Sequence, residues 1–262
     1  MSAQPVRHGG GGKGRLRALA CRALPLVIAI EVGLLSAAGA PSGGATAMQA
    51  GVSVARLSRQ VEPSVVDTIT FADPAGSQIL GTGIILSSSG LVLTAYHVIR
   101  GDIFIGVRVG GTGVVHPADV LVTDPDADLA LLQIQGAPPL KPAELARTSA
   151  AAIGDPVIAI GNAMGLGQVP RAVAGRLVAL HRSISYGVGS GTVDLDGVIE
   201  AEAPIFAGDS GGALVDATGH VIGLIAAGSD DGPCAPAAVC PLHLAYAIPI
   251  HTALTQIGYT TL

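Results

Sequence analysis

The 262-residue sequence contains no tryptophan and few other aromatic residues, and charged side chains make up only 13% of it. This scarcity of charge, together with 49% hydrophobic residues, excludes a chain that is mostly disordered. The core must therefore consist of Val, Leu, Ile and Ala, and 37 glycines and 17 prolines supply many turns. Such a composition is typical of a compact β-rich protein.

Basic side chains are scarce beyond residue 50. Residues 51–262 carry nine Lys and Arg against 18 Asp and Glu, which gives this part of the chain a net charge of −9. Phosphate backbones repel so acidic a protein, and we expect no nucleic-acid partner. The sequence also lacks an H-E-x-x-H string and any cluster of metal ligands. We therefore expect neither a metal nor another cofactor.

The first fifty residues differ from the rest. Basic side chains precede an apolar run from Leu24 to Ala40, and small residues follow it. This order is typical of a secretory signal peptide. The run is interrupted by Pro25 and Glu31 and is short for a membrane span, which needs about 20 residues. Residues 1–50 are thus predicted to direct export, as a cleaved leader in preference to a retained membrane anchor.

Cysteine is rare, and two of the three cysteines lie close together. Cys21 precedes the apolar run, which is the wrong order for a lipid-modified cysteine. Cys234 and Cys240 enclose a short loop, and in an exported protein this spacing predicts a local disulfide. A metal site would need two further ligands, which His243 alone does not supply.

From about residue 64, short runs rich in Val, Ile and Leu alternate with Gly, Pro, Asp and Ser every 8 to 12 residues, which is typical of a barrel or sandwich. A loop region from residue 136 to about 152 divides the body into predicted domains 51–150 and 151–262. Helix is expected only at residues 52–61 and near the C-terminus. The predicted strands are 65–70, 78–86, 91–93, 103–109, 119–122, 129–134, 157–160, 172–180, 197–202, 213–215, 221–226 and 244–248.

The string Gly208-Asp209-Ser210-Gly211-Gly212 is the most informative in the sequence. A nucleophilic serine needs a sharp turn that exposes its oxygen, and main-chain N–H groups that bind the developing oxyanion. The N–H groups of Gly208 and Ser210 would form this oxyanion hole. A surface turn between strands can carry the same five letters, so the string alone does not decide.

Two upstream strings support a catalytic reading. His97 follows the apolar strand at residues 91–93, and Asp128 directly precedes the strand at 129–134. An acid there can accept the proton-bearing nitrogen of His97, fix its tautomer and leave the other nitrogen for Ser210. Asp124 and Asp126 compete with Asp128 on charge alone. The other histidines are predicted to be surface or packing residues: His116, His181, His220, His243 and His251.

Taken together, these strings resemble the trypsin-like (chymotrypsin-fold) serine peptidases, within them the exported bacterial HtrA/DegP type and its actinobacterial secreted relatives. The resemblance implies an all-β fold of two perpendicular six-stranded antiparallel barrels with the active site in the cleft between them. It also implies His97 as general base, Asp128 as its orienting partner and Ser210 as nucleophile. The matching strings are 81–85, 93–99, 128–132, 159–162, 165–167, 175–180, 208–212 and 245–249.

The family pattern also distinguishes between the three aspartates, and it shows one position where this chain departs from the family. The family's acid directly precedes a Leu-Ala-x-Leu strand, which selects Asp128 and leaves Asp124 and Asp126 as turn residues. HtrA-type enzymes usually have Asn before the serine, where this chain has Asp209. A buried unpaired carboxylate is costly, so we expect Arg171, or else Arg176, to be its partner. Arg171→Ala should then cut turnover sharply.

The predicted pocket for the residue before the scissile bond is small and apolar. Pro204, six positions before the serine, would lie at its base. The opposing wall would consist of Ile225, Ala226, Ala227 and Gly228. We expect a preference for residues such as Ala, Val or Leu. The strand from Leu224 to Gly228 should also pair with the substrate backbone.

The sequence therefore predicts an exported serine endopeptidase that acts on polypeptides. The alternative is an exported binding protein with the same fold and little turnover. The chain ends about a dozen residues beyond Ile248-Pro249. We accordingly expect no regulatory PDZ domain after the protease part, and a monomer.

Overall fold

The computed structural model describes residues 54–71, 78–101, 104–111, 113–147, 151–162, 169–188, 191–229 and 242–259. The predicted leader and the predicted disulfide between Cys234 and Cys240 lie outside these residues. Residues 54–61 are helical, and the 3-10 turn η1 (Glu62–Ser64) connects them to the first strand. Within the described ranges, no helix is both long and apolar enough to cross a membrane.

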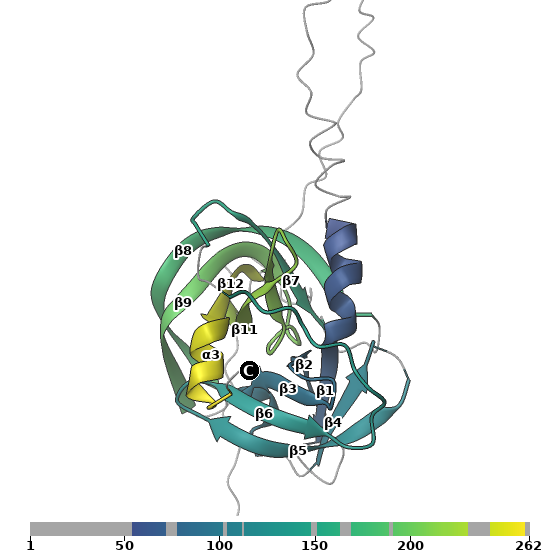
Figure 1. Ribbon diagram of the computed structural model, residues 1–262. Coiled ribbons are helices and arrows are strands. Elements are labelled where there is room, and N and C mark those ends of the chain that lie inside the picture. Colours follow the sequence, from purple (N-terminus) through teal and green to yellow (C-terminus); the bar gives the residue numbers. More distant parts are fainter. Residues whose placement is uncertain are drawn as a thin grey trace, which may run out of the picture. The chain divides into compact units, whose positions relative to one another are not determined.

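Six antiparallel strands close into a first barrel in the order β1-β2-β3-β6-β5-β4 (Figure 1). Side chains that alternate along the strands fill its interior, among them Val66, Val92, Val107 and Leu132. The one-turn helix α2 (Tyr96–Ile99) follows the third strand directly. The strands are β1 (Val65–Phe71), β2 (Gln78–Ile85), β3 (Leu91–Ala95), β4 (Phe104–Val109), β5 (Val115–Asp124) and β6 (Leu129–Ile134).

The second half of the chain forms another closed antiparallel barrel, in the order β10-β11-β12-β9-β8-β7, followed by helix α3 (Ile250–Gln256). The predicted fold of two six-stranded antiparallel barrels is therefore confirmed. The strands are β7 (Pro156–Gly161), β8 (Arg171–Val188), β9 (Gly191–Ile205), β10 (Ala213–Asp216), β11 (Val221–Ser229) and β12 (Leu242–Pro249).

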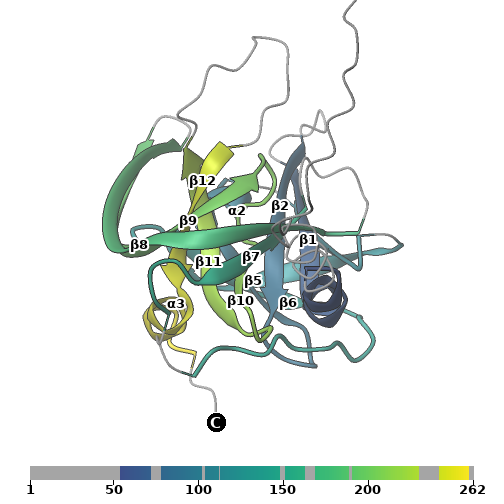
Figure 2. The ribbon, with the colours of Figure 1, turned by 90° about the horizontal axis from the view of Figure 1, so that it is seen from above.

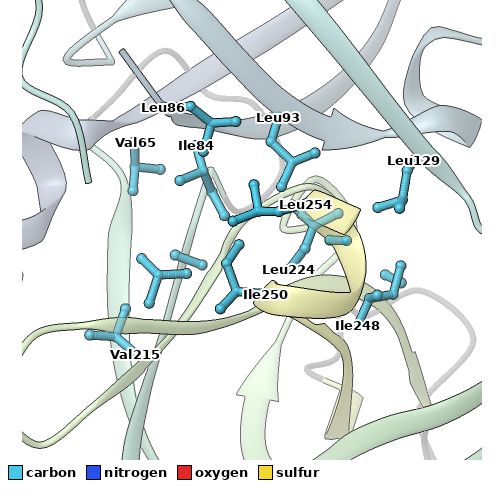
Figure 3. Packing of buried hydrophobic residues seen from close by; sticks show 14 of the residues in the cluster. Val65, Ile84, Leu86, Leu93, Leu129, Val215, Leu224, Ile248, Ile250 and Leu254 are labelled. Carbon is cyan, nitrogen blue, oxygen red and sulfur yellow. The ribbon is translucent and has the colours of Figure 1, made fainter. Parts of the chain in front are cut away.

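A shared hydrophobic core joins the two barrels (Figure 3). Ile84, Leu93 and Leu129 of the first barrel and Leu224 of the second are completely buried in it. Ile250 from α3 covers the same cluster. Burying one such side chain contributes about 1.5–3 kcal/mol. The core thereby holds the end of β3 and the loop after β9 at a fixed separation.

The β8–β9 hairpin is much longer than predicted, and its two strands run side by side as a curved ribbon (Figures 1 and 2). Along the extra part of β8, Ile184, Tyr186 and Val188 are half-buried while Ser183 and Ser185 are exposed. This alternation is the strand signal that the prediction missed. Three register shifts between Leu177 and Ile184 bend the hairpin and separate this alternation from that of the predicted part of β8.

Candidate active site

His97 is the second residue of α2, which starts where β3 leaves the first barrel. The backbone N–H of Tyr96 donates to the carbonyl of Asp128 at 3.1 Å, which fixes the start of this helical turn against the start of β6. The backbone N–H of His97 donates to Asp128 Oδ1 at 2.8 Å. The His97 ring atom Nδ1 lies 2.7 Å from Asp128 Oδ2. Both carboxylate oxygens therefore bind the same residue.

Asp128 is completely buried, whereas the His97 side chain is 20% exposed. Asp128 ends the turn before β6 with a φ of +53°, a left-handed conformation that Asp tolerates better than most residues. Earlier in this turn, Asp124 Oδ1 accepts the N–H of Ala127 at 3.1 Å, and Asp126 is exposed. Of the three aspartates that compete in the sequence, Asp128 is the one in contact with His97.

A tyrosine from the second barrel also binds Asp128. Tyr186 Oη donates to Asp128 Oδ2 at 2.6 Å, and the Tyr186 and His97 rings meet edge to face with centroids 6.3 Å apart. Burial, followed by the charge and hydrogen bond of Asp128, raises the pKa of Tyr186 far above its ordinary value, so the hydroxyl remains a donor. Sequence reasoning missed Tyr186, and its only signal was the rarity of tyrosine, with four in the chain.

Ser210 lies in the tight loop between β9 and β10 and is half-buried. The N–H of Asp209 donates to the carbonyl of Phe206, and the N–H of Gly212 donates to the carbonyl of Asp209, so two consecutive turns carry the serine. Gly208 and Gly211 have φ values of +99° and +86°. Glycine adopts these left-handed conformations without a steric penalty, and the loop therefore needs it at both positions.

Thr82 of β2 anchors this serine loop to the first barrel. Its Oγ1 donates to the carbonyl of Gly208 at 2.7 Å, and its backbone N–H donates to the carbonyl of Ser210 at 2.8 Å. The same hydroxyl accepts the N–H of Asn162 from the end of β7. Thr82 therefore connects three chain segments, a role that sequence reasoning missed. The available signal was its position between Gly81 and Gly83 in a string already noted.

The serine loop packs tightly against the strand that precedes His97. A Cβ atom on Gly211 would lie 2.0 Å from the Thr82 carbonyl oxygen and 2.5 Å from Thr94 Oγ1. Thr94 is three residues before His97, so the backbone beside Ser210 lies next to the His97-bearing end of β3. Within the described part of the chain, no hydrogen bond connects the side chains of His97 and Ser210.

Two main-chain donors of the serine loop have no acceptor among the described residues. These are the N–H groups of Gly208 and Ser210, the pair predicted as an oxyanion hole. The Asp209 carbonyl faces the N–H of Gly212, and a trans peptide directs its N–H away from its C=O. The N–H of Ser210 therefore points out of that turn. Such preorganised free donors can stabilise a developing oxyanion.

Asp209 is 5% exposed and only partly hydrogen-bonded. Its Oδ2 accepts the N–H of Phe206 at 2.8 Å, while Oδ1 has no partner. Burial raises the pKa of Asp209 to about 6, against the lowering effects of the Phe206 N–H and the charge of Arg171. Oδ1 points towards Gly161, where a Cβ would lie 2.5 Å away.

The expected ion pair between Arg171 and Asp209 is replaced by an indirect contact. The Arg171 guanidinium lies over the Phe206 ring, 4.8 Å from its centroid, and no ion pair within 4 Å reaches Asp209 from the described residues. Arg171 thus acts on Asp209 through Phe206 and through space. The alternative partner, Arg176, instead pairs with Glu202 on the surface, with 2.6 Å between Nη2 and Oε2.

The residues expected to form a specificity pocket are not equivalent. The Ile225 side chain is 1% exposed and packs inside the second barrel, and its backbone groups bind the serine loop at Gly211 and Gly212. The backbone of Ile225 therefore cannot pair with a substrate strand, contrary to expectation. Ala226 is also buried, while Ala227 and Gly228 are half-buried.

Pro204 lies apart from this wall. It lines a shallow cavity together with charged side chains, including Arg176 and Glu202, and none of the β11 residues. Its neighbour Ile205 faces β11 instead, because a Cβ on Gly228 would lie 2.8 Å from the Ile205 and Leu242 Cδ1 atoms. The side chains of Ile205 and Leu242 therefore close the space at Gly228, and neither was among the residues expected to form the pocket.

One of the other histidines has more polar neighbours than expected. His220 Nδ1 lies 2.6 Å from Thr218 Oγ1 and 3.9 Å from Asp216 Oδ1, and its Nε2 lies 3.8 Å from Glu144. Asp216 Oδ1 also accepts the backbone N–H groups of Thr218 and His220, so the group is a hydrogen-bonded β-turn between β10 and β11. His181, His243 and His251 are exposed, and His116 is half-buried on β5.

Residues 81–224, more than half of the chain, match the family model described as a trypsin-like peptidase domain. The matched range includes His97, Asp128 and Ser210. The chain belongs to the trypsin-like peptidase family. This trypsin-like peptidase is 36% identical over 236 residues to the serine protease PepD of Mycobacterium tuberculosis, covering 84% of this chain and 49% of PepD.

Other relatives are similar over shorter or more divergent stretches. The chain is 37% identical over 146 residues to the periplasmic serine endoprotease DegP of Salmonella typhimurium, covering 55% of this chain and 29% of DegP. It thus spans about half of PepD and less than a third of DegP. The active form of the Rv3671c protease of M. tuberculosis has a TM-score of 0.63 and 26% identity, over 78% of this chain and 85% of that one. The HtrA-type protease AlgW with a tripeptide has a TM-score of 0.64 and 31% identity, over 77% and 61%.

Proposed function

We propose that this trypsin-like peptidase is an exported serine endopeptidase with Ser210 as nucleophile, His97 as general base and Asp128 as the orienting acid. The observation that carries the proposal is the 2.7 Å contact between His97 Nδ1 and the buried Asp128 carboxylate. This contact leaves the other ring nitrogen available for a serine hydroxyl.

In the proposed reaction, His97 Nε2 takes the proton of the Ser210 hydroxyl while the serine oxygen attacks a peptide carbonyl. The carbonyl oxygen becomes an oxyanion that binds the free N–H groups of Gly208 and Ser210. Collapse of this intermediate breaks the C–N bond, and His97 gives its proton to the leaving amine. Water then hydrolyses the acyl-enzyme by the same steps, with His97 again the base. Activity should fall in acid, because a protonated imidazole cannot accept the serine proton.

We further propose a preference for small or medium apolar residues before the scissile bond. The half-buried Ala227 and Gly228 and the Ile205 side chain at Gly228 support a shallow apolar surface next to the serine loop. The substrate strand would then pair with the end of β11 beyond Ile225. Digestion of a peptide library followed by mass spectrometry tests this preference, and cleavage mainly after Arg or Lys would contradict it.

Export and a monomeric state complete the proposal. The order of residues 1–50 supports export, and the relatives include a protease named as periplasmic. The natural source organism's culture medium or envelope fraction should contain the protein. Sedimentation of the purified chain should give the mass of one copy.

A binding protein of the same fold remains the second candidate, because no hydrogen bond joins His97 to Ser210 among the described residues. Catalytic hydrogen bonds often tighten only when substrate binds, so this geometry does not decide. A fluorophosphonate probe distinguishes the enzyme from the binding protein. The enzyme requires labelling that is lost in Ser210→Ala, reduced in His97→Ala and kept in Ser87→Ala, a control in the turn before β3. Folded protein that resists the probe would contradict the enzyme and support the binding protein.

A further inference from the structure

Asp128 receives one hydrogen bond that the proposed triad does not itself require. The donor, Tyr186 Oη, binds Oδ2, the same oxygen that faces His97 Nδ1. Tyr186 is 58 positions away from Asp128 and belongs to the other barrel. The contact exists because the long β8–β9 hairpin extends back to the first barrel.

The hairpin is held in this position from two sides. Arg100, which directly follows α2, donates from Nη1 to the carbonyl of Val188 at 3.1 Å. The Tyr186 ring packs against the core that joins the barrels, together with Ile184 and Val193. The hydroxyl of Tyr186 is therefore directed at Asp128 by the fold and not by a mobile side chain on the surface.

We propose that Tyr186 is a positioning residue for the His97–Asp128 pair, orienting the carboxylate and excluding water from it. The inference rests on the proposed function, because it assigns Tyr186 a part in the same reaction. Tyr186 would act through Asp128, without touching the substrate.

The hydrogen-bonding requirements of a buried carboxylate support this role. Asp128 has no exposed surface, so each of its oxygens needs protein donors. The backbone N–H of His97 serves Oδ1, and Tyr186 shares Oδ2 with the imidazole. By donating to Oδ2, Tyr186 withdraws part of the negative charge that this oxygen offers to His97. The hydroxyl therefore fixes the carboxylate and moderates how strongly the protonated imidazole is held.

The other charged groups on the surrounding elements are Arg100 after α2, Asp124 and Asp126 in the turn before β6, Asp194 on β9 and Asp209 in the serine loop. Within the described residues, none of these five makes a hydrogen bond or ion pair with the side chain of His97 or Asp128. They therefore do not compete with Tyr186 for the Asp128 carboxylate.

The direct test is Tyr186→Phe in the full chain, which keeps the ring and removes only the hydroxyl. Loss of a hydrogen bond to a charged group should lower kcat by about 10- to 100-fold. KM should stay constant, and the acid limb of the kcat/KM profile should move to higher pH. Tyr259→Phe is the matched control, since it loses a hydroxyl bond to the Leu86 carbonyl in the same core. A Tyr186→Phe enzyme with the kcat and pH profile of this control would overturn the inference.

A second measurement does not depend on turnover. In a Ser210→Ala background, NMR follows the titration of His97 with and without Tyr186→Phe. The midpoint should rise when the hydroxyl is removed, and an unchanged midpoint would contradict the role. If the wild type resists the fluorophosphonate probe while this midpoint still moves, the positioning contact stands and the proposed function fails. If the wild type reacts and the midpoint is unchanged, only the inference fails.

Arg100→Ala provides a variant in case Tyr186→Phe does not fold. It removes the anchor on the Val188 carbonyl and leaves every group that contacts Asp128 in place. A several-fold loss of kcat with a shifted acid limb supports the inference. Wild-type values for both would overturn it.

Discussion

Asp128, in the turn before β6, and Asp209, in the loop before β10, are both buried, at 0% and 5% exposure. Asp128 receives a backbone N–H on one oxygen and two side-chain partners on the other. Asp209 receives one backbone N–H, and its other oxygen has no partner. Similar burial therefore comes with very different support for a negative charge.

The difference shows that the number of donors, more than the degree of burial, decides what a buried carboxylate can do. Asp128 is equipped to remain an acceptor for His97. Burial raises the pKa of Asp209 to about 6, so Asp209 changes its charge within a moderate pH range. The two loops thus combine a carboxylate with partners on both oxygens, next to His97, and a titratable carboxylate in the serine loop.

Asp128→Asn changes the aspartate that has partners on both oxygens, and it should have the largest effect on kcat. The amide can donate to His97 Nδ1, which favours the wrong imidazole tautomer, and kcat should fall on the order of 10⁴-fold. Steady-state kinetics on a small ester substrate measures this. Asp126→Asn changes an exposed carboxylate of the same turn and should retain wild-type kcat. A loss of less than tenfold in Asp128→Asn would remove Asp128 from the proposed triad.

Asp209→Asn should keep the fold and change the pH dependence of the free energy of unfolding. Because the pKa of Asp209 rises from 3.8 to about 6 on folding, the native state binds a proton between these pH values and the unfolded chain does not. The free energy of unfolding therefore falls as pH rises through this window, by on the order of 3 kcal/mol for this one group. Asparagine keeps an acceptor for the Phe206 N–H and carries no charge, so this fall should disappear.

Urea denaturation between pH 4 and pH 8 checks this prediction. The variant should equal the wild type near pH 4 and exceed it above pH 6. Part of the pH dependence should remain, because burial also raises the pKa of Asp67, beside Arg108, to about 6. Asp119→Asn, on the exposed face of β5, is the control. Parallel stability curves for Asp209→Asn and the wild type would show that Asp209 does not titrate in this range.

Thr82→Val tests whether the serine loop depends on its anchor in the first barrel. The change removes the Thr82 hydroxyl and leaves Asp209 unaltered. The change leaves the Gly208 carbonyl and the Asn162 N–H without the threonine hydroxyl. The N–H groups of the proposed oxyanion hole would then be misplaced, which should lower kcat by about 10- to 100-fold. Thr68→Val on β1 is the control, since the buried Thr68 hydroxyl has no partner. Equal kcat values for the two variants would dismiss Thr82 as the anchor of the loop.

Arg171→Ala should have the smallest effect. Its contact with the Phe206 ring is a cation–π interaction worth about 0.5–1 kcal/mol, so turnover should fall only about two- to fivefold. This is a milder loss than a direct ion pair with Asp209 would give. Arg176→Ala removes a surface pair with Glu202 and serves as the control, measured by the same ester assay. A hundredfold loss in Arg171→Ala would indicate that Arg171 contacts Asp209 directly in the working enzyme.

Much of the architecture could be predicted from local patterns. Period-two alternation and the turn residues between the runs located all twelve strands, and β6 matches its predicted bounds. The β8–β9 extension was missed because three register shifts separate its alternation from that of the predicted part of β8. The residues of the serine turn and the acid before β6 were also recognisable, since turn chemistry depends on near neighbours in the chain.

The sequence by itself determined the two-barrel fold and the pairing of His97 with Asp128. The tertiary structure alone decided that Thr82 holds the serine loop, that Tyr186 reaches Asp128 and that Arg171 lies on the Phe206 ring without pairing directly with Asp209. These contacts join residues as far as 126 positions apart. They depend on strand register and on the packing of one barrel against the other, which are set by the whole core and leave no local signal in the chain.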